Sequence, residues 1–283
     1  VDAAHRGVRA YRLAGLAGTS NVLAGLDFNT PVSGTMAHSF VQACDSEMEA
    51  FKTYARLYPG TTLLVDTYDT IKAVGNIIEW LKQDSQARIG GIRLDSGNLV
   101  EEAAQCRKML DEAGFNDIKI MASGGLDEYR IADIVSSGAP IDGFGVGTAI
   151  GSSKDGAALE LAFKLTEYAG SPRMKNSPGK QSYPGRKQLY RQLGDDGRIV
   201  RDIVAGRDDA EEGDPLLKQV MAQGRIIDGA IAPLDDQVEA AELKLEQLPE
   251  SFRHLEPVDK DPVVISHSLQ ALQRETLAKV SSA

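Results

Sequence analysis

Six short apolar runs recur along the first part of the chain. Each is continuous rather than alternating with polar residues, which is typical of strands buried on both faces of a parallel sheet. The sequence therefore predicts strands at Tyr11–Ala17, Pro31–Thr35, Thr62–Asp66, Ile89–Leu94, Ile118–Ala122 and Ile141–Val146.

Stretches with helical spacing separate these runs. In residues 40–57, and again in 99–113, apolar side chains fall on one stripe of a helix. Alternating strands and helices predict an α/β fold, either a (β/α) barrel or an open doubly wound sheet. We favour the barrel, because polar residues follow nearly every run and barrels place their active sites there. Six runs are too few to close such a barrel, and the chain starts at Val1, so we expect an N-terminal segment to be missing.

The pattern changes near residue 169. Prolines and glycines crowd residues 170–190 and indicate loops, and a hairpin follows over Gln188–Leu193 and Arg198–Ala205. Helices are expected near 235–247 and 266–280. The sequence thus predicts a barrel portion over residues 1–168 and a C-terminal extension over 169–283 that contributes to a second domain.

Composition narrows the class of protein. The 283 residues carry a net charge of −10, and residues 206–261 hold fifteen acidic and six basic side chains, so general nucleic-acid binding is not expected. Two cysteines exclude a disulfide framework and a four-cysteine zinc site. No uncharged apolar stretch approaches the roughly 20 residues that cross a bilayer, and no signal peptide opens the chain. We expect a cytoplasmic protein that binds no membrane.

One window departs from the acidic balance. Residues 168–194 contain six basic side chains and no acidic one. Such a run either faces a small polyanion or is simply solvated.

His38 and Asp66 are the first candidates for chemistry. His38 follows the second run within GTMAHS and could act as a base, a metal ligand or a phosphoryl acceptor, or be a merely hydrogen-bonded loop residue. Asp66 ends the third run, where its carboxylate could orient the imidazole if the two strands are neighbours. Asp69 or Thr67 could instead cap the following helix.

A basic and an acidic residue share the end of the fourth run. Arg93 and Asp95 lie two apart and therefore point the same way. Together they could hold a phosphorylated sugar, with Arg93 on phosphate and Asp95 on hydroxyls. A structural ion pair is the alternative.

Glycines dominate the turns after the last two runs, in ASGGLD (122–127) and GFGVGT (143–148). Glycine lets backbone N–H groups approach an anion closely, and the last loops of a barrel are a frequent phosphate site. The glycine spacing does not match the dinucleotide-binding fingerprint, and no HExxH, Walker A or Gly-x-Ser-x-Gly motif is present.

Taken together, these segments resemble the nicotinate phosphoribosyltransferase family. The resemblance runs from about residue 11 to 275, in the order of the family, through GTSNVLAG (18–25), GTMAHSF (34–40), LLVDTYDT (63–70), GIRLDSGNL (91–99), ASGGLDEYRI (122–131), DGFGVGTAI (142–150) and KNSPGKQSYPGRKQLYR (175–191).

The resemblance implies a type II phosphoribosyltransferase of NAD biosynthesis. Such enzymes join nicotinate to phosphoribosyl pyrophosphate (PRPP), with ATP hydrolysis coupled through a phosphohistidine and with Mg²⁺ accompanying ATP and PRPP. Their active site is shared across a homodimer. No metal ligand is assigned in this chain.

Carried onto this sequence, the family's site gives three groups of residues. His38, Asp66 and Asp95 would be catalytic, with His38 phosphorylated. Arg93 would hold the phosphoribosyl group together with Asp95. The 5′-phosphate pocket would be lined by Gly124, Gly125, Gly145, Gly147 and Thr148.

Ser20 bears on the choice of base. The related nicotinamide-using enzymes carry an acidic residue at this place in the GTSN motif, which would repel a carboxylate, whereas the hydroxyl of Ser20 can donate to it. The sequence thus favours nicotinate as the substrate.

Three alternatives stay open: a quinolinate or nicotinamide phosphoribosyltransferase, a barrel aldolase or isomerase, and a non-catalytic phosphate-binding fragment. The histidine motif speaks against quinolinate. An aldolase would need a lysine at a strand end and an isomerase a glutamate there, and the sequence has neither.

Overall fold

A computed structural model describes residues 2–152, 161–177, 179–256, 258 and 263–281 of the chain. It contains two compact units, one formed by Val1–Val8 with Ala17–Ala157 and the other by Arg9–Leu16 with Ala158–Ala283. Among the described residues, no helix is long and apolar enough to span a membrane.

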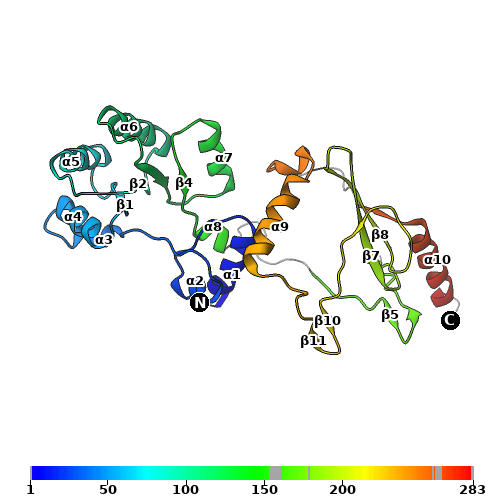
Figure 1. Cartoon of the computed structure of the whole chain (residues 1–283). Coiled ribbons are helices and arrows are strands. Elements are labelled where there is room, and N and C mark those ends of the chain that lie inside the picture. Colours follow the sequence, from blue (N-terminus) through cyan, green and yellow to red (C-terminus); the bar gives the residue numbers. More distant parts are fainter. Residues whose placement is uncertain (1, 153–160, 178, 257, 259–262, 282–283) are drawn as a thin grey trace. The chain divides into compact units, whose positions relative to one another are not determined.

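The first unit is built on a parallel sheet. Its four strands pair in the order β1-β2-β3-β4, all parallel (Figure 1). The strands are β1 (Thr62–Leu64), β2 (Gly91–Leu94), β3 (Lys119–Ala122) and β4 (Gly143–Phe144). The last four predicted strands and the α/β class are therefore confirmed. The described strands of this unit form a four-stranded sheet, and its closure into a barrel stays a prediction.

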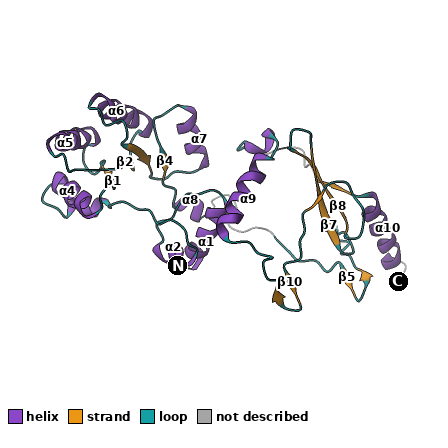
Figure 2. Cartoon of the chain, viewed as in Figure 1, coloured by secondary structure: helices purple, strands orange, loops and turns teal. Residues whose placement is uncertain are grey.

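Helices connect successive strands and lie around their outer side, as the alternation of purple and orange segments in Figure 2 shows. Side-chain caps start several of them: Asp69 accepts a hydrogen bond from the backbone N–H of Lys72, and Asp127 accepts one from that of Arg130. The helices of this unit are α2 (Val22–Asp27), α3 (His38–Gln42), α4 (Glu47–Leu57), α5 (Thr70–Gln83), α6 (Leu99–Glu112), α7 (Glu128–Ser136) and α8 (Thr148–Gly151), and α1 (Asp2–Leu13) is divided between the two units.

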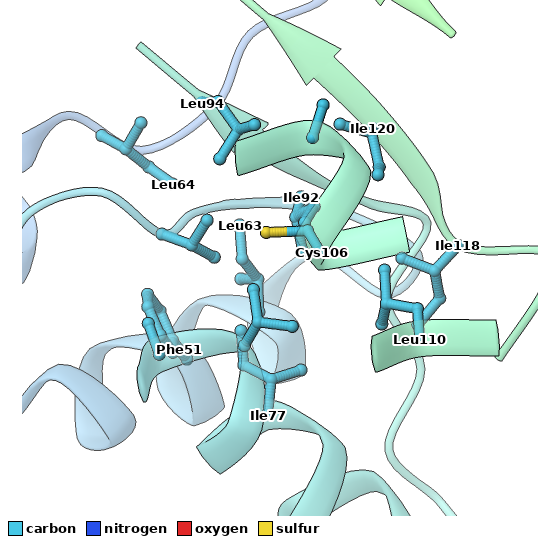
Figure 3. Close-up of a cluster of buried hydrophobic side chains, with 14 of the residues drawn as sticks. Phe51, Leu63, Leu64, Ile77, Ile92, Leu94, Cys106, Leu110, Ile118 and Ile120 are labelled. Atoms are coloured by element: carbon cyan, nitrogen blue, oxygen red, sulfur yellow. The ribbon is translucent and has the colours of Figure 1, made fainter. Parts of the chain in front are cut away.

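A single apolar core joins the sheet to helices α3–α7. Leu63, Ile92 and Ile120 come from three adjacent strands and are fully buried against Phe51 and Ile77 of α4 and α5 (Figure 3). Fully burying one such side chain contributes about 1.5–3 kcal/mol, so this core fixes the strand ends in place.

Two predicted strands are wrong. Residues Tyr11–Leu13 end helix α1, because the run is preceded by helix-forming residues and continues their pattern until Gly15, where φ is +94°. Pro31–Thr35 contains no strand, only an isolated bridge between Val32 and Thr19. A continuous apolar run does not by itself separate a strand from a buried piece of helix or loop.

The prediction of a single helix over residues 40–57 is also wrong, because the helix is interrupted between α3 and α4. Ser46 accepts a hydrogen bond from the backbone N–H of Glu49 and so caps a new helix. The break leaves His38 in the first turn of α3.

The second unit has a sheet of its own, in the order β12-β8-β7-β9. β7 and β8 form the predicted hairpin, and the two expected C-terminal helices are present as α9 and α10. The elements are β5 (Glu167–Tyr168), β6 (Ser171–Pro172), β7 (Lys187–Leu193), β8 (Ile199–Gly206), β9 (Asp214–Pro215), β10 (Met221–Ala222), β11 (Arg225–Ile226), α9 (Leu234–Glu246), a 3-10 helix (Glu250–Arg253), β12 (Val263–Ile265) and α10 (His267–Ser281).

Four of the six basic residues of the 168–194 window have side-chain partners inside this unit. Arg191 forms two hydrogen bonds with Asp202, and Arg186 pairs with Glu167. Lys187 donates to the carbonyl of Gly185, and Lys175 donates to the hydroxyl of Ser177. These four serve the fold of the second unit.

Candidate active site

The carboxyl ends of the parallel strands bring together the polar residues that follow them. Asp66 lies two residues beyond β1, Arg93 and Asp95 lie at the end of β2, and Ser123 directly follows β3. Because all four strands run in the same direction, these ends meet at one edge of the sheet. The loops that precede α3 and α5 add Thr35 and Thr67, and the first turn of α3 adds His38.

Arg93 is held by three partners. Its Nε donates to Ser123 Oγ (2.6 Å), its Nη1 to Thr35 Oγ1 (2.7 Å), and its Nη2 to a carboxylate oxygen of Asp95. The guanidinium has five N–H donors, so donors remain after these bonds, and 28% of the side chain is exposed. A cation held rigidly in this way is suited to binding phosphate.

Asp95 is kept ionised by its neighbours. Burial acts to raise the pKa of its carboxyl group, but hydrogen bonds from Ser123 and Arg93, together with the charge of Arg93, outweigh burial and bring the pKa below its ordinary value. The site therefore holds a fixed negative charge beside the guanidinium.

His38 faces two carboxylates with one nitrogen and a hydroxyl with the other. Its Nε2 lies 3.8 Å from Asp95 Oδ2 and 4.0 Å from Asp66 Oδ1. Its Nδ1 lies 3.0 Å from the Oγ1 of Thr67. The imidazole is 40% exposed and thus open to a substrate.

Asp66 is the most deeply buried charged group of the site, with 3% of its side chain exposed. Its Oδ2 accepts hydrogen bonds from the backbone N–H of Asp95 (3.0 Å) and from Ser96 Oγ (2.6 Å). Its Oδ1 is buried without a hydrogen-bond partner and lies 4.0 Å from Nε2 of His38. A buried polar atom of this kind marks a place where an additional donor is accommodated.

The glycine loops pack directly on this cluster. Gly124 has φ of +90°, and a Cβ at this position would come within 1.7 Å of the carbonyl oxygen of Asp95. A Cβ at Gly145 would lie 3.3 Å from that of Ser123. Gly125 also has a positive φ, of +60°. At Gly124 only a residue without a side chain allows so close an approach, whereas a Cβ at Gly145 would be tight and Gly125 is favoured by its positive φ.

Among the described residues, three predicted site residues have no hydrogen bond or ion pair to the cluster. Ser20 is exposed next to the bridge between Thr19 and Val32, and Gly147 and Thr148 begin the short helix α8. Within the described ranges, no hydrogen bond or ion pair joins these three to His38, Asp66, Arg93 or Asp95. Their predicted roles stay predictions.

The hydroxyl residues are not among the site residues that the sequence predicts. Thr35 and Ser123 bind Arg93, Ser123 also binds Asp95, and Ser96 binds Asp66. From the sequence, Thr67 is only a possible helix cap, a role that Asp69 takes. The available signal was their position beside charged residues in strand-end loops. The described residues contain no group of three or more His, Cys, Asp or Glu placed to hold a metal ion.

Comparisons with known proteins point to one family. The model of the nicotinate phosphoribosyltransferase (NAPRTase) family matches residues 3–188. A nicotinate phosphoribosyltransferase of Mycobacterium tuberculosis is 46% identical over 267 residues, which cover 94% of this chain and 58% of the relative. One of Bacillus subtilis is 44% identical over 199 residues, or 68% of this chain and 41% of the relative.

Solved structures agree on the fold. The human nicotinic acid phosphoribosyltransferase superposes with a TM-score of 0.77 at 24% identity, over 95% of this chain and 66% of that one. A nicotinate-nucleotide pyrophosphorylase from Pyrococcus furiosus superposes with a TM-score of 0.74 at 27% identity, over 87% of this chain and 62% of that one. The chain thus spans about half of the length of the curated relatives it matches.

Proposed function

Because the chain belongs to the nicotinate phosphoribosyltransferase family, we propose that the protein transfers a phosphoribosyl group from PRPP to nicotinate in NAD biosynthesis. The products are nicotinate mononucleotide and pyrophosphate. The observation that carries this proposal is the guanidinium of Arg93, held by three partners at the same sheet edge as His38, Asp66 and the glycine loops.

The reaction requires opposite charges to be stabilised at once. The nicotinate nitrogen donates its electron pair to C1 of the ribose while the C1–O bond breaks and its electrons leave with pyrophosphate. Arg93 faces the phosphates, and the ionised Asp95 stabilises the positive charge that develops on the ribose. Gly124, Gly125 and Gly145 admit the 5′-phosphate. Positioning supplies most of the catalysis.

His38 is the proposed acceptor of a phosphoryl group from ATP. Two carboxylates beside Nε2 repel an incoming phosphate, so Nδ1 is the nitrogen that attacks. Its electron pair forms the N–P bond as the bond from the γ-phosphorus to the bridging oxygen breaks, with that electron pair leaving on ADP. Water later releases phosphate from the imidazole.

The Mg²⁺ expected with ATP and PRPP stays a prediction. The described residues offer no group of three or more metal-ligating side chains for it, so the phosphates of the substrates are its expected ligands. Carried by these phosphates, it would supply positive charge to the departing pyrophosphate.

The wider assembly also stays a proposal: closure of the parallel sheet into a (β/α) barrel, a cytoplasmic location, and a homodimer that completes the site. Exposed apolar side chains on α2, namely Val22, Leu23 and Leu26, support an interface on that helix. Sedimentation of the purified chain tests the dimer, and a monomer at micromolar concentration would contradict it.

Product formation tests the proposed function. The chain is incubated with nicotinate or nicotinamide, PRPP and Mg²⁺, with and without ATP, and nicotinate mononucleotide is measured. We expect nicotinate to be the preferred base, ATP to stimulate its use, and His38→Ala to abolish that stimulation. Preferential use of nicotinamide, or no product with either base, would overturn the assignment.

A further inference from the structure

Thr67 has a hydroxyl group that the fold does not use. It lies in the loop between β1 and α5, where Asp69 rather than Thr67 caps the helix. Within the described part of the chain, the only hydrogen bond of its Oγ1 is the 3.0 Å contact with Nδ1 of His38. This side chain therefore serves the imidazole and not the local backbone.

The surroundings of the ring decide which nitrogen carries the proton. Nε2 faces Asp95 Oδ2 at 3.8 Å and Asp66 Oδ1 at 4.0 Å. Ionised carboxylates only accept hydrogen bonds, so a lone pair on Nε2 would face two negative oxygens, whereas an N–H there is attracted by both. In the neutral ring the proton thus belongs on Nε2.

This tautomer leaves a lone pair on Nδ1, which needs a donor. The Thr67 hydroxyl is the group in contact with Nδ1, and it can donate or accept. If it accepted, the proton would lie on Nδ1 and the unfavourable lone pair would return to Nε2. The hydroxyl therefore donates to Nδ1.

We propose that Thr67 is a positioning residue that fixes the Nε2–H tautomer and the ring orientation of His38, and so presents the Nδ1 lone pair for phosphoryl transfer. The inference rests on the proposed phosphorylation of His38. As the N–P bond forms, the Thr67 hydroxyl turns from Nδ1 to donate to a phosphoryl oxygen. The proton on Nε2 stays shared with the carboxylates, and the bond to ADP breaks as described above.

Three variants separate this role from a structural one. Thr67→Val keeps the shape of the side chain and removes the hydroxyl, and Thr67→Ser keeps the hydroxyl. Thr70→Val is the matched control, because its hydroxyl, three residues away, donates to Glu102. The rate of ³²P incorporation from γ-labelled ATP is measured in each full chain, together with the ¹⁵N shifts of the His38 ring in its neutral form.

We expect Thr67→Val to lower the labelling rate about tenfold, as loss of one hydrogen bond implies, and Thr67→Ser and Thr70→Val to label within about twofold of wild type. The ring nitrogens of the wild type should show a protonated Nε2 and an unprotonated Nδ1, and Thr67→Val should shift the Nδ1 signal. Equal labelling and unchanged shifts in Thr67→Val would overturn the proposal, as would a Thr67→Ser variant as impaired as Thr67→Val. If the wild type takes up no phosphate, the proposed phosphorylation fails, and the nitrogen shifts alone decide the role of Thr67.

Discussion

The carboxylate of Asp142 connects the segment before β4 to strand β3 of the parallel sheet. Asp142 precedes β4 and accepts hydrogen bonds from the backbone N–H of Ile120 in β3 (2.8 Å) and from Lys119 Nζ (3.0 Å). Burial acts to raise the pKa of Asp142, but these two bonds and the nearby positive charges outweigh it and lower the pKa below the ordinary 3.8.

This lowered pKa predicts a pH-dependent contribution to stability. The carboxylate stabilises the fold above about pH 4, and the contribution is lost as the pH falls below 3.8 through the depressed pKa of the folded state. Urea unfolding of wild type and Asp142→Asn should show a difference in unfolding free energy that is largest at neutral pH and shrinks in acid. A difference that grows below pH 4 would contradict this.

The buried thiol of Cys106 is expected to be unreactive in the folded protein. Burial, with the charge of Glu102 as the smaller cause, raises the pKa of its thiol to about 12, so the reactive thiolate is absent near neutral pH. In a Cys44→Ser variant, a thiol reagent should modify Cys106 only as the protein unfolds, as judged by mass spectrometry. In the Cys106→Ser variant the only thiol is that of the half-buried Cys44, which should react with the reagent faster than Cys106 does. Equal rates would disprove the protection of Cys106.

At this scale the sequence located the charged residues better than their supports. His38, Asp66, Arg93 and Asp95 were identified because charged side chains at the ends of apolar strands are conspicuous. Thr35, Thr67 and Ser123 were not, because a hydroxyl in a loop has many equivalent uses until its partner is known.

At the scale of elements, the turns between strands and helices limit which side chains are tolerated. Gly124 and Gly138 both have positive φ, +90° and +72°, but a Cβ at Gly124 meets the carbonyl of Asp95 while one at Gly138 has nothing within 4 Å. Substituting each glycine by alanine therefore distinguishes the cost of backbone strain alone, at Gly138, from the cost of strain with a steric clash, at Gly124.

Gly138→Ala should cost only the strain of a left-handed conformation, about 1–2 kcal/mol. Gly124→Ala should destabilise the protein by more than that and should also weaken PRPP binding, because the loop must move away from Asp95. Urea unfolding and calorimetric titration measure the two effects. Equal losses of stability in the two variants would show that the close approach at Gly124 has no consequence.

Strands β1–β4 could be predicted because each lies in an apolar run bounded by polar turns. The runs at 11–17 and 31–35 could not be assigned in the same way, since neither pairs along a neighbouring strand and pairing is not visible in a single run. The break before α4 depends on one capping serine within a continuous apolar stripe. The apolar stripe predicts one continuous helix, but the Ser46 cap starts a new helix at Glu47.

At the scale of the whole molecule, the sequence indicates a change of architecture near residue 169, and the predicted domain bounds of 1–168 and 169–283 stay predictions. The structure groups Ala158–Ala283 with Arg9–Leu16 in one compact unit. Arg9 donates to Gln237 of α9, a contact across 228 residues that no local pattern announces. Long-range packing of this kind becomes visible only in three dimensions.

The central claim is that the carboxyl edge of the parallel sheet binds PRPP through Arg93. Arg88 is the matched control, because it precedes β2 at the opposite end of the strand and donates only to the carbonyls of Ser85 and Ala87 among the described contacts. Calorimetric titration of PRPP with Mg²⁺ into wild type, Arg93→Gln and Arg88→Gln tests the claim. We predict binding that Arg93→Gln weakens at least about tenfold and Arg88→Gln leaves unchanged. Equal binding by the two variants, or no binding by the wild type, would contradict it.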